Sequence, residues 1–343
     1  MKARLLPRQE LDDLSDAGNL RALIAALAKT PYRRPLEAAL VHLVGREAVL
    51  RTVRDDLETT LARIRRFYRG QAAIKVGIVL RVYDIRNLRA LLRGLSSHAT
   101  PDEIRAALLP VGELSSDVLS DLAQATNPRA AIDHLASMAL PFAAPLLRLR
   151  AERPGATTQE MELRLDQWYF QHAFDAVQEP ADETLLAALR LEADLINLQT
   201  VLRLAAMPEE QKTLPERVGA DEVDRLFVGP GRIPFALLVR AAGREAVDEA
   251  VEVLQPTAYG APLSAGLDGY RRTGRLSSFE RHLYRFRLTS FARLIARHPL
   301  GIGVVLGYLA LKTNEVNNLR WITNGIHLGM EPQKIRAELV YAP

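Results

Sequence analysis

The chain has 343 residues, of which 48% are hydrophobic and 25% are charged, and it contains no cysteine. This balance is typical of a globular protein, and the absence of cysteine excludes disulfides and thiolate metal sites and favours a reducing compartment. The 45 basic residues nearly balance the 41 acidic ones, and the basic clusters lack interleaved aromatic and glycine residues, so no nucleic-acid partner is predicted. The first residues lack the apolar core of a signal peptide, and the longest apolar run, of about 12 residues, is too short to cross a bilayer.

Helical apolar spacing recurs along nearly the whole chain, and no alternating strand pattern bounded by hairpin signals is found. The clearest examples are residues 84–95 and 191–204, whose apolar residues follow the three-and-four spacing of one helix face. The sequence therefore predicts an all-α fold.

Helix ends are marked by proline and glycine. Pro101 and Pro332 each predict the first position of a short helix, where the missing proline N–H costs nothing. Gly94 and Gly325 are predicted to end the preceding helices, because glycine tolerates the left-handed conformation after a helix C-terminus.

An aromatic-x-x-Pro-Leu block occurs three times. Its copies are Tyr32–Leu36, Phe142–Leu146 and Tyr259–Leu263. Because proline must begin or break a helix, we expect the ring to fill a core pocket at a bend. The proline then starts the next helix and the leucine packs behind it.

An acid-x-x-Asn-Leu block follows each aromatic block. Its copies are Asp84–Leu88, Asp194–Leu198 and Glu315–Leu319. Asparagine has weak helix propensity, so an asparagine inside all three predicted helices needs another explanation. Two remain open: a hydrogen bond at a helix crossing, or a polar lining that contacts a partner.

These blocks belong to a threefold internal repeat. A shift of 231 positions gives nine identities in the 22 residues from 87 to 108. We therefore predict three helical repeat domains, at 1–112, 113–230 and 231–343, with the second joint at Gly229–Gly231. The additional polar sequence between Met207 and Ala220 is predicted to be a surface loop.

Residues that would carry catalysis or hold a cofactor are not recognisable. The seven histidines are nowhere three or four residues apart, and no P-loop or nucleophile elbow occurs. Gly301, Gly303 and Gly307 lack the spacing and the strand context of a dinucleotide loop. We therefore predict no enzyme activity, no cofactor and no metal site.

One arginine cluster could bind an anionic partner or form a solvated helix face. Its members are Arg63, Arg65, Arg66 and Arg69.

The segment from His298 to Leu309, followed by Lys312, Glu315, Asn318-Leu319-Arg320 and Ile335-Arg336, resembles the C subunit of bacterial and archaeal V/A-type ATPases. The equivalent protein in eukaryotic vacuolar ATPases is the d subunit. The segments 83–92 and 191–204 are also similar to helices of that family.

This resemblance implies a funnel of three similar helical domains around a pseudo-threefold axis. It also implies a non-catalytic central-stalk subunit that couples the axle of the soluble motor to the membrane rotor ring, peripheral on the cytoplasmic face of the membrane. Rotor ring subunits, axle subunits and lipid headgroups are then the expected partners. The candidate funnel-lining residues are Asp84, Asn87, Asp194, Asn197, Glu315 and Asn318. The alternative is an all-helical adaptor or scaffold with no link to a rotary motor.

Overall fold

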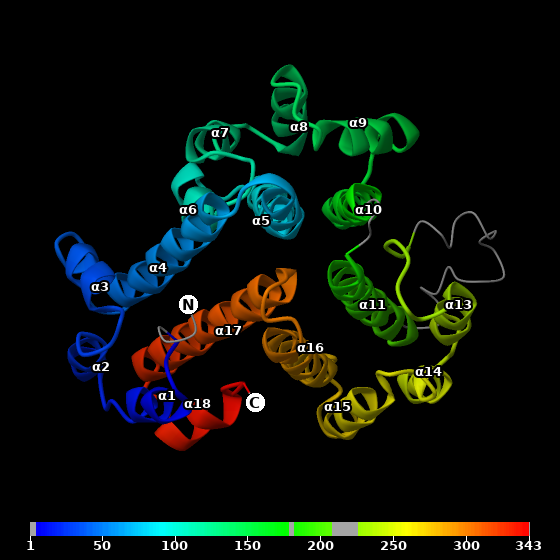
Figure 1. Ribbon diagram of the computed structural model, residues 1–343. Helices are drawn as coiled ribbons and strands as arrows, with labels where there is room; N and C mark the ends of the chain where they lie inside the picture. The colour runs from blue at the N-terminus through cyan, green and yellow to red at the C-terminus, as the bar shows by residue number, and fades with distance from the viewer. Residues whose placement is uncertain (1–4, 178–181, 208–225, 343) are drawn as a thin grey trace. The chain divides into compact units, whose positions relative to one another are not determined.

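The protein is described by a computed structural model that covers residues 5–177, 182–207 and 226–342. All regular secondary structure in these ranges is helical, which confirms the all-α prediction (Figure 1). The predicted loop between Met207 and Ala220 lies almost entirely in 208–225, outside the described residues.

The chain divides into two compact units. The first, called the terminal unit, contains residues 1–76 and 288–343, and the second, called the central unit, contains residues 77–287. The division cuts through two long helices, α5 (Gly70–Ser96) and α16 (Ser277–Arg297). The arrangement of three domains as a pseudo-threefold funnel stays a prediction, and so do their boundaries.

The terminal unit is built around two long antiparallel helices, α4 (Gly45–Phe67) and α17 (Ile302–His327), which lie side by side (Figure 1). Arg46 near the start of α4 donates a hydrogen bond to Asn324 near the end of α17, so the two helices run in opposite directions. Shorter helices pack around them: α1 (Arg8–Ser15), α2 (Leu20–Leu27), α3 (Arg33–Leu40) and α18 (Pro332–Glu338).

The central unit contains most of α5 and two further long helices, α10 (Thr158–Ala176) and α11 (Glu183–Ala205). Short helices connect and cover the long ones. They are α6 (Pro101–Ala107), α7 (Ser116–Leu122), α8 (Pro128–Ser137), α9 (Ala143–Glu152), α13 (Phe235–Ala242), α14 (Val247–Leu254) and α15 (Gly260–Thr273).

The rings and leucines of the aromatic blocks are buried as the sequence predicts, but each helix begins two residues before the proline and not at it. Tyr32, Phe142 and Tyr259 are buried, and the leucine of each block is buried as well. Helices α3, α9 and α15 begin directly after the ring. The proline therefore falls in the first helical turn, where the backbone N–H groups have no partner within the helix.

The predicted helix starts are confirmed, but the role predicted for Gly94 and Gly325 is wrong. Pro101 and Pro332 open α6 and α18. Helices α5 and α17, however, end at Ser96 and His327, and the left-handed residues are His98 (φ 58°) and Gly329 (φ 68°). Gly94 and Gly325 instead let the next helix approach closely. A Cβ on Gly94 would lie 2.6 Å from Ile104, and one on Gly325 would lie 2.7 Å from Ile335.

Candidate functional site

The six residues predicted to line a funnel are all buried, with side chains bonded inside their own unit. They lie on three long helices, α5, α11 and α17. Their bonds support the first of the two explanations for the repeated asparagine, except that the partners lie in non-helical segments and not on a crossing helix. Contact of these six residues with another subunit stays a prediction.

Each repeated asparagine holds the backbone of one residue through two hydrogen bonds. Asn87 Nδ2 donates to the carbonyl oxygen of Leu109 at 2.8 Å, and the amide of Leu109 donates to Asn87 Oδ1 at 2.7 Å. The same pair of bonds joins Asn197 to Val228 and Asn318 to Val340. Only a side-chain amide offers a donor and an acceptor in this geometry, which explains why the block carries asparagine.

The aspartate of the first block fixes the same connecting segment a few residues further on. Asp84 accepts backbone N–H bonds from Glu113 at 2.8 Å and from Leu114 at 3.0 Å. Gly112 precedes these donors, and a Cβ there would lie 2.1 Å from an Asp84 carboxylate oxygen. The position therefore requires glycine, because the carboxylate occupies the space of a side chain.

The second block repeats this arrangement with the same offsets. Asp194 accepts backbone bonds from Arg232 at 2.9 Å and from Ile233 at 3.1 Å. A Cβ on Gly231 would lie 1.9 Å from the Asp194 carboxylate. In both blocks the glycine stands three residues after the asparagine's partner, and the two amide donors come four and five residues after it. We call each such set an acid–asparagine lock.

The third lock takes its donors from the beginning of the chain. Glu315 accepts a bond from the backbone N–H of Leu6 at 2.5 Å and one from the Tyr32 hydroxyl at 2.6 Å. Tyr259 donates to Asp194 in the same way at 2.7 Å. The tyrosine of one aromatic block thus donates to the acid of another repeat. Tyr32 of the first repeat bonds to Glu315 of the third, and Tyr259 of the third repeat bonds to Asp194 of the second. The remaining block carries Phe142, which has no hydroxyl.

Replacing Tyr259 with phenylalanine is expected to lower the free energy of unfolding by about 1.5–3 kcal/mol at neutral pH, as for a hydrogen bond to a charged group. Burial raises the pKa of Asp194 above its ordinary 3.8, and the bond from Tyr259 opposes this. Because folding raises the pKa of Asp194, ionisation of this acid lowers the free energy of unfolding. Loss of the Tyr259 hydroxyl makes that decrease larger. The cost should therefore shrink as the pH falls toward the acidic range.

Urea denaturation at several pH values measures this cost. Tyr270→Phe, which removes the same atom from a tyrosine inside α15, is the matched control. Equal effects of the two substitutions, or a cost of Tyr259→Phe independent of pH, would contradict the assignment.

A buried charge cluster adjoins the third lock. The Lys312 ammonium lies 2.6 Å from Asp56 and 2.7 Å from Glu315, and its side chain is 3% exposed. It also donates to the Tyr32 hydroxyl at 2.8 Å. Burial alone would lower the pKa of Lys312, but the charges of Glu315 and Asp56 outweigh it and raise the pKa above 10.5. The lysine is therefore held in its charged form and joins α4, α17 and the start of α3.

The stability of the terminal unit is expected to fall steeply as the pH rises past 10. The contribution of Lys312 is complete below its ordinary pKa of 10.5 and is lost as the pH passes the raised folded value. The pKa of Tyr32 is raised well above 10.0 by burial and by Glu315, so ionisation of this tyrosine in the unfolded chain acts in the same direction. Melting temperatures between pH 8 and 11 test this, and Lys312→Met should flatten the decline. An equally steep decline in that variant would contradict the assignment.

Buried and half-buried ion pairs join long helices within the central unit. Arg89 of α5 lies 3.2 Å from Glu162 and 2.8 Å from Asp166, both on α10. Arg93, one turn after Arg89, also pairs with Glu162. Burial raises the pKa of Asp166, and Arg89 opposes this shift. The two helices, which come from different repeats, are thus fixed in register by complementary charges at four-residue spacing.

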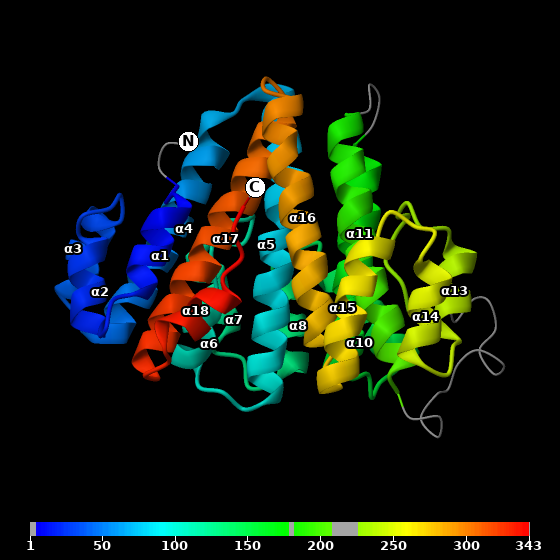
Figure 2. The same ribbon diagram turned by 90° about the horizontal axis from the view of Figure 1, so that it is seen from below.

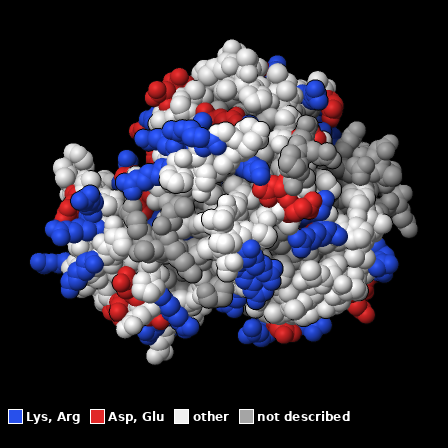
Figure 3. Space-filling view, viewed as in Figure 1, with Lys and Arg blue, Asp and Glu red and all other residues white. Residues whose placement is uncertain are grey.

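The residues of the predicted arginine cluster are not among those that form the three locks. Arg63, Arg65, Arg66 and Arg69 are exposed at the end of α4 and in the turn that follows it. Figure 3 shows Lys and Arg side chains gathered over this part of α4. The locks are internal, so these arginines are the predicted site residues that face solvent.

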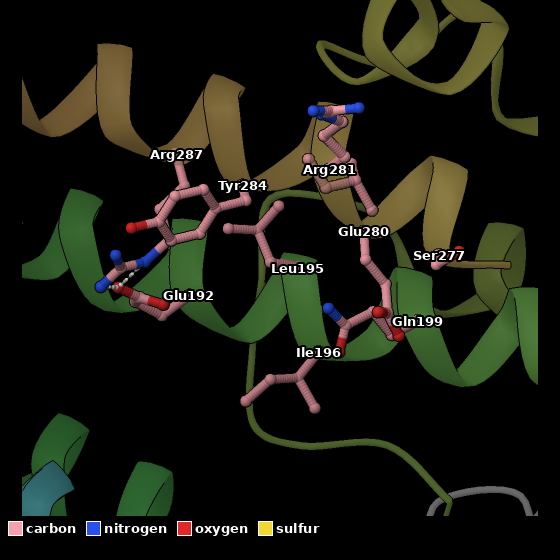
Figure 4. A pocket seen from close by; sticks show the side chains of 10 residues that line it. Glu192, Leu195, Ile196, Gln199, Ser277, Glu280, Arg281, Tyr284 and Arg287 are labelled. Carbon is pink, nitrogen blue, oxygen red and sulfur yellow. Dashed lines mark hydrogen bonds and ion pairs between the residues drawn. The ribbon is translucent and has the colours of Figure 1, made fainter. Parts of the chain in front are cut away.

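A cavity of about 550 Å³ opens between α11 and α16 in the central unit (Figure 4). Glu192 and Arg287 form an ion pair at its wall, with a shortest distance of 2.5 Å, and Tyr284 lies beside them. Burial alone would lower the pKa of Arg287, but the charge of Glu192 raises it. The polar lining includes Gln199, Ser277 and Glu280 but no histidine.

The described part of the chain offers neither a metal site nor a membrane span. Among the described residues, no group of three His, Cys, Asp or Glu side chains could hold a metal ion. Within those same ranges, no helix combines the length and the apolar character needed to cross a bilayer.

Several of these residues escaped the sequence prediction. The pairing of Arg89 and Arg93 with Glu162 and Asp166 was detectable as two matching patterns at four-residue spacing. The amide of Leu6 carries no sequence signal, because any residue except proline supplies the same donor.

The described residues form an all-helical protein in which one buried motif recurs three times. A model of the family described as ATP synthase (C/AC39) subunit matches residues 1–338, and the chain belongs to this family. Membership confirms the resemblance seen in the sequence.

Proteins named as the C subunit of A-type ATP synthases are similar to nearly the whole chain. The protein from Methanosarcina barkeri is 27% identical over 345 aligned residues, which cover 99% of this chain and 90% of the relative. The protein from Methanocaldococcus jannaschii is 24% identical, with 99% of this chain and 83% of the relative covered. The protein from Halobacterium salinarum is 26% identical, with 90% and 86% covered.

Proposed function

We propose that the protein is a non-catalytic central-stalk subunit of a V/A-type rotary ATPase or ATP synthase. It couples the axle of the soluble motor to the membrane rotor ring, so that ATP turnover drives, or is driven by, transport of H⁺ or Na⁺. Its partners in this proposal are the axle and ring subunits, and its place is peripheral, on the cytoplasmic face of the membrane. The match of the family over residues 1–338 carries the proposal.

The acid–asparagine locks support this role because a coupling element must resist twisting. Each lock ties non-helical segments to a long helix through several hydrogen bonds from buried groups. Buried polar groups are costly to leave unpaired, so alternative arrangements of these segments lie high in energy. The helices and their connections therefore deform together, as transmission of torque requires.

The residues predicted to contact a partner fall into two groups with different roles. The six acid and asparagine residues contribute through stiffness, and their direct contact with an axle or ring stays a prediction. The exposed arginines at the end of α4 are candidate contacts to an anionic surface.

Purification of the tagged chain from gently solubilised native membranes tests the role. We expect one copy per complex, in a detergent-stable assembly that hydrolyses ATP. Membranes depleted of the chain should keep ATP hydrolysis in the soluble motor but lose ion transport, and adding the purified chain back should restore transport. Recovery of the chain alone, or with soluble partners that lack ATPase activity, would instead favour a helical adaptor.

A further inference from the structure

Two chain turns that are far apart in sequence lie at the same end of the terminal unit. Helices α4 and α17 are antiparallel, as the contacts from Arg46 to Asn324 and from Asp56 to Lys312 show. The end of α4 and the turn into α5 therefore lie at the same end of the unit as the turn between α16 and α17. Both turns are seen at the upper edge of Figure 2. We call residues 59–76 and 288–304 the basic end.

The basic end carries only positive formal charge. Residues 59–76 contain five Lys or Arg residues and residues 288–304 contain two, with no Asp or Glu in either segment. Arg63, Arg66, Arg293 and Arg297 are exposed. Elsewhere on the same unit, some exposed arginines pair with carboxylates, as Arg33 lies 2.8 Å from Glu37 and Arg51 lies 2.8 Å from Asp55. The two segments that form the basic end supply no such carboxylate.

Large apolar side chains protrude among these cations. Phe67 is 77% exposed, Ile74 is 53% exposed and Leu300 is fully exposed at 102%. They lie at the end of α4, at the start of α5 and in the turn between α16 and α17. Exposed apolar residues are common singly, but here three lie at the two turns of one end of the unit.

This combination fits the surface of an anionic bilayer. Apolar side chains that protrude at turns can enter the boundary between headgroups and acyl chains, while surrounding arginines bind the phosphates. A protein partner of comparable strength needs a packed interface of about 1,000 Å² or more, with a central anchor in a pocket. Side chains as exposed as Phe67 and Leu300 project into solvent and do not form a pocket on this chain for a partner's anchor.

We propose that the basic end docks on anionic phospholipid headgroups, with Phe67 and Leu300 entering the interface. This proposal rests on the proposed function in one respect, which is that the protein works at a membrane. Its test uses the purified full chain and is therefore independent of assembly into a complex.

The test is co-sedimentation with vesicles of phosphatidylglycerol and phosphatidylcholine, or of phosphatidylcholine alone, at low and high salt. We expect binding only to the anionic vesicles, weakened by salt. The double variant Arg63→Gln/Arg66→Gln should bind about tenfold or more weakly. The matched control, Arg21→Gln/Arg34→Gln, removes the same charge from exposed positions of α2 and α3 in the same unit and should keep most of the binding. Phe67→Ser/Leu300→Ser should weaken the binding that persists at high salt.

Equal losses of vesicle binding in the two arginine variants would overturn the proposal, because binding would then depend on the overall charge of the chain and not on the basic end. Absence of binding to anionic vesicles would overturn it as well. If the Arg63→Gln/Arg66→Gln chain then also lost partners that the unsubstituted chain recovers from membranes, the basic end would be a protein interface. Failure of the coupling role appears separately, as failure of the unsubstituted chain to recover an ATPase.

Discussion

Lys312→Met is expected to lower the free energy of unfolding of the terminal unit by about 3–5 kcal/mol, the cost of breaking a buried ion pair. The substitution keeps the length of the side chain but leaves Asp56 and Glu315 facing each other without their shared cation. Both carboxylates are buried, so water cannot replace the ammonium. The loss should also loosen the contact of α3 with the third lock, because Tyr32 donates to Glu315.

A matched control is available in the same unit. Lys334 pairs with Glu331 at 3.2 Å with the same three-residue spacing as Lys312 and Glu315, but both of its side chains are about 70% exposed. Lys334→Met is therefore expected to change stability by less than about 0.5 kcal/mol.

The two tryptophans make the measurement specific, because Trp321 lies in the terminal unit and Trp168 in the central unit. Urea titration followed by the fluorescence of Trp321, in a Trp168→Phe background, reports on the terminal unit. Similar midpoints for Lys312→Met and Lys334→Met would show that the buried cluster contributes nothing.

Gly112→Ala is expected to destabilise the central unit by about 3 kcal/mol, through overpacking and the loss of amide bonds to a buried carboxylate. The new Cβ would lie 2.1 Å from an Asp84 oxygen, so the carboxylate or the segment after Gly112 must move. Either movement breaks the bonds from Glu113 and Leu114.

A gain in stability is expected for alanine at Gly77, which lies inside α5 with nothing within 4 Å of a Cβ. Gly77→Ala should stabilise the chain by about 0.5–1 kcal/mol, because alanine loses less backbone entropy in a helix. The fluorescence of Trp168 in a Trp321→Phe background reports on the central unit.

The double variant Asp84→Ala/Gly112→Ala should lower the free energy of unfolding by less than the sum of its single variants, since removing the carboxylate removes the clash. Strict additivity would show that the two residues do not compete for space.

Much of the fold was predictable because it depends on local chemistry. The helices that contain residues 84–95 and 191–204 follow from apolar spacing alone. Burial of Tyr32, Phe142 and Tyr259 follows from a ring at a bend that a proline three residues later marks as a helix start region. The prediction for Gly94 failed because a glycine near a helix end has two explanations, a left-handed cap or a close contact. Only the position of Ile104 decides between them.

The site was predictable as a set of residues but not as a set of bonds. The repeat singled out Asp84, Asn87 and their equivalents, since an asparagine inside a helix demands an explanation. The sequence left a partner lining and an internal bond equally open, because burial depends on what packs over the helix. Backbone donors such as Leu6 N–H could not be found at all, since they are common to every residue except proline.

The sequence by itself therefore determined the helical class, the threefold repeat and the family, because these are written in spacing and residue type. The tertiary structure alone decided that the aromatic block of the first repeat completes the acid block of the third. That pairing joins Tyr32 to Glu315 across 283 positions. Periodicity along a chain reports which face of a helix is buried, but it does not report which distant segment buries it.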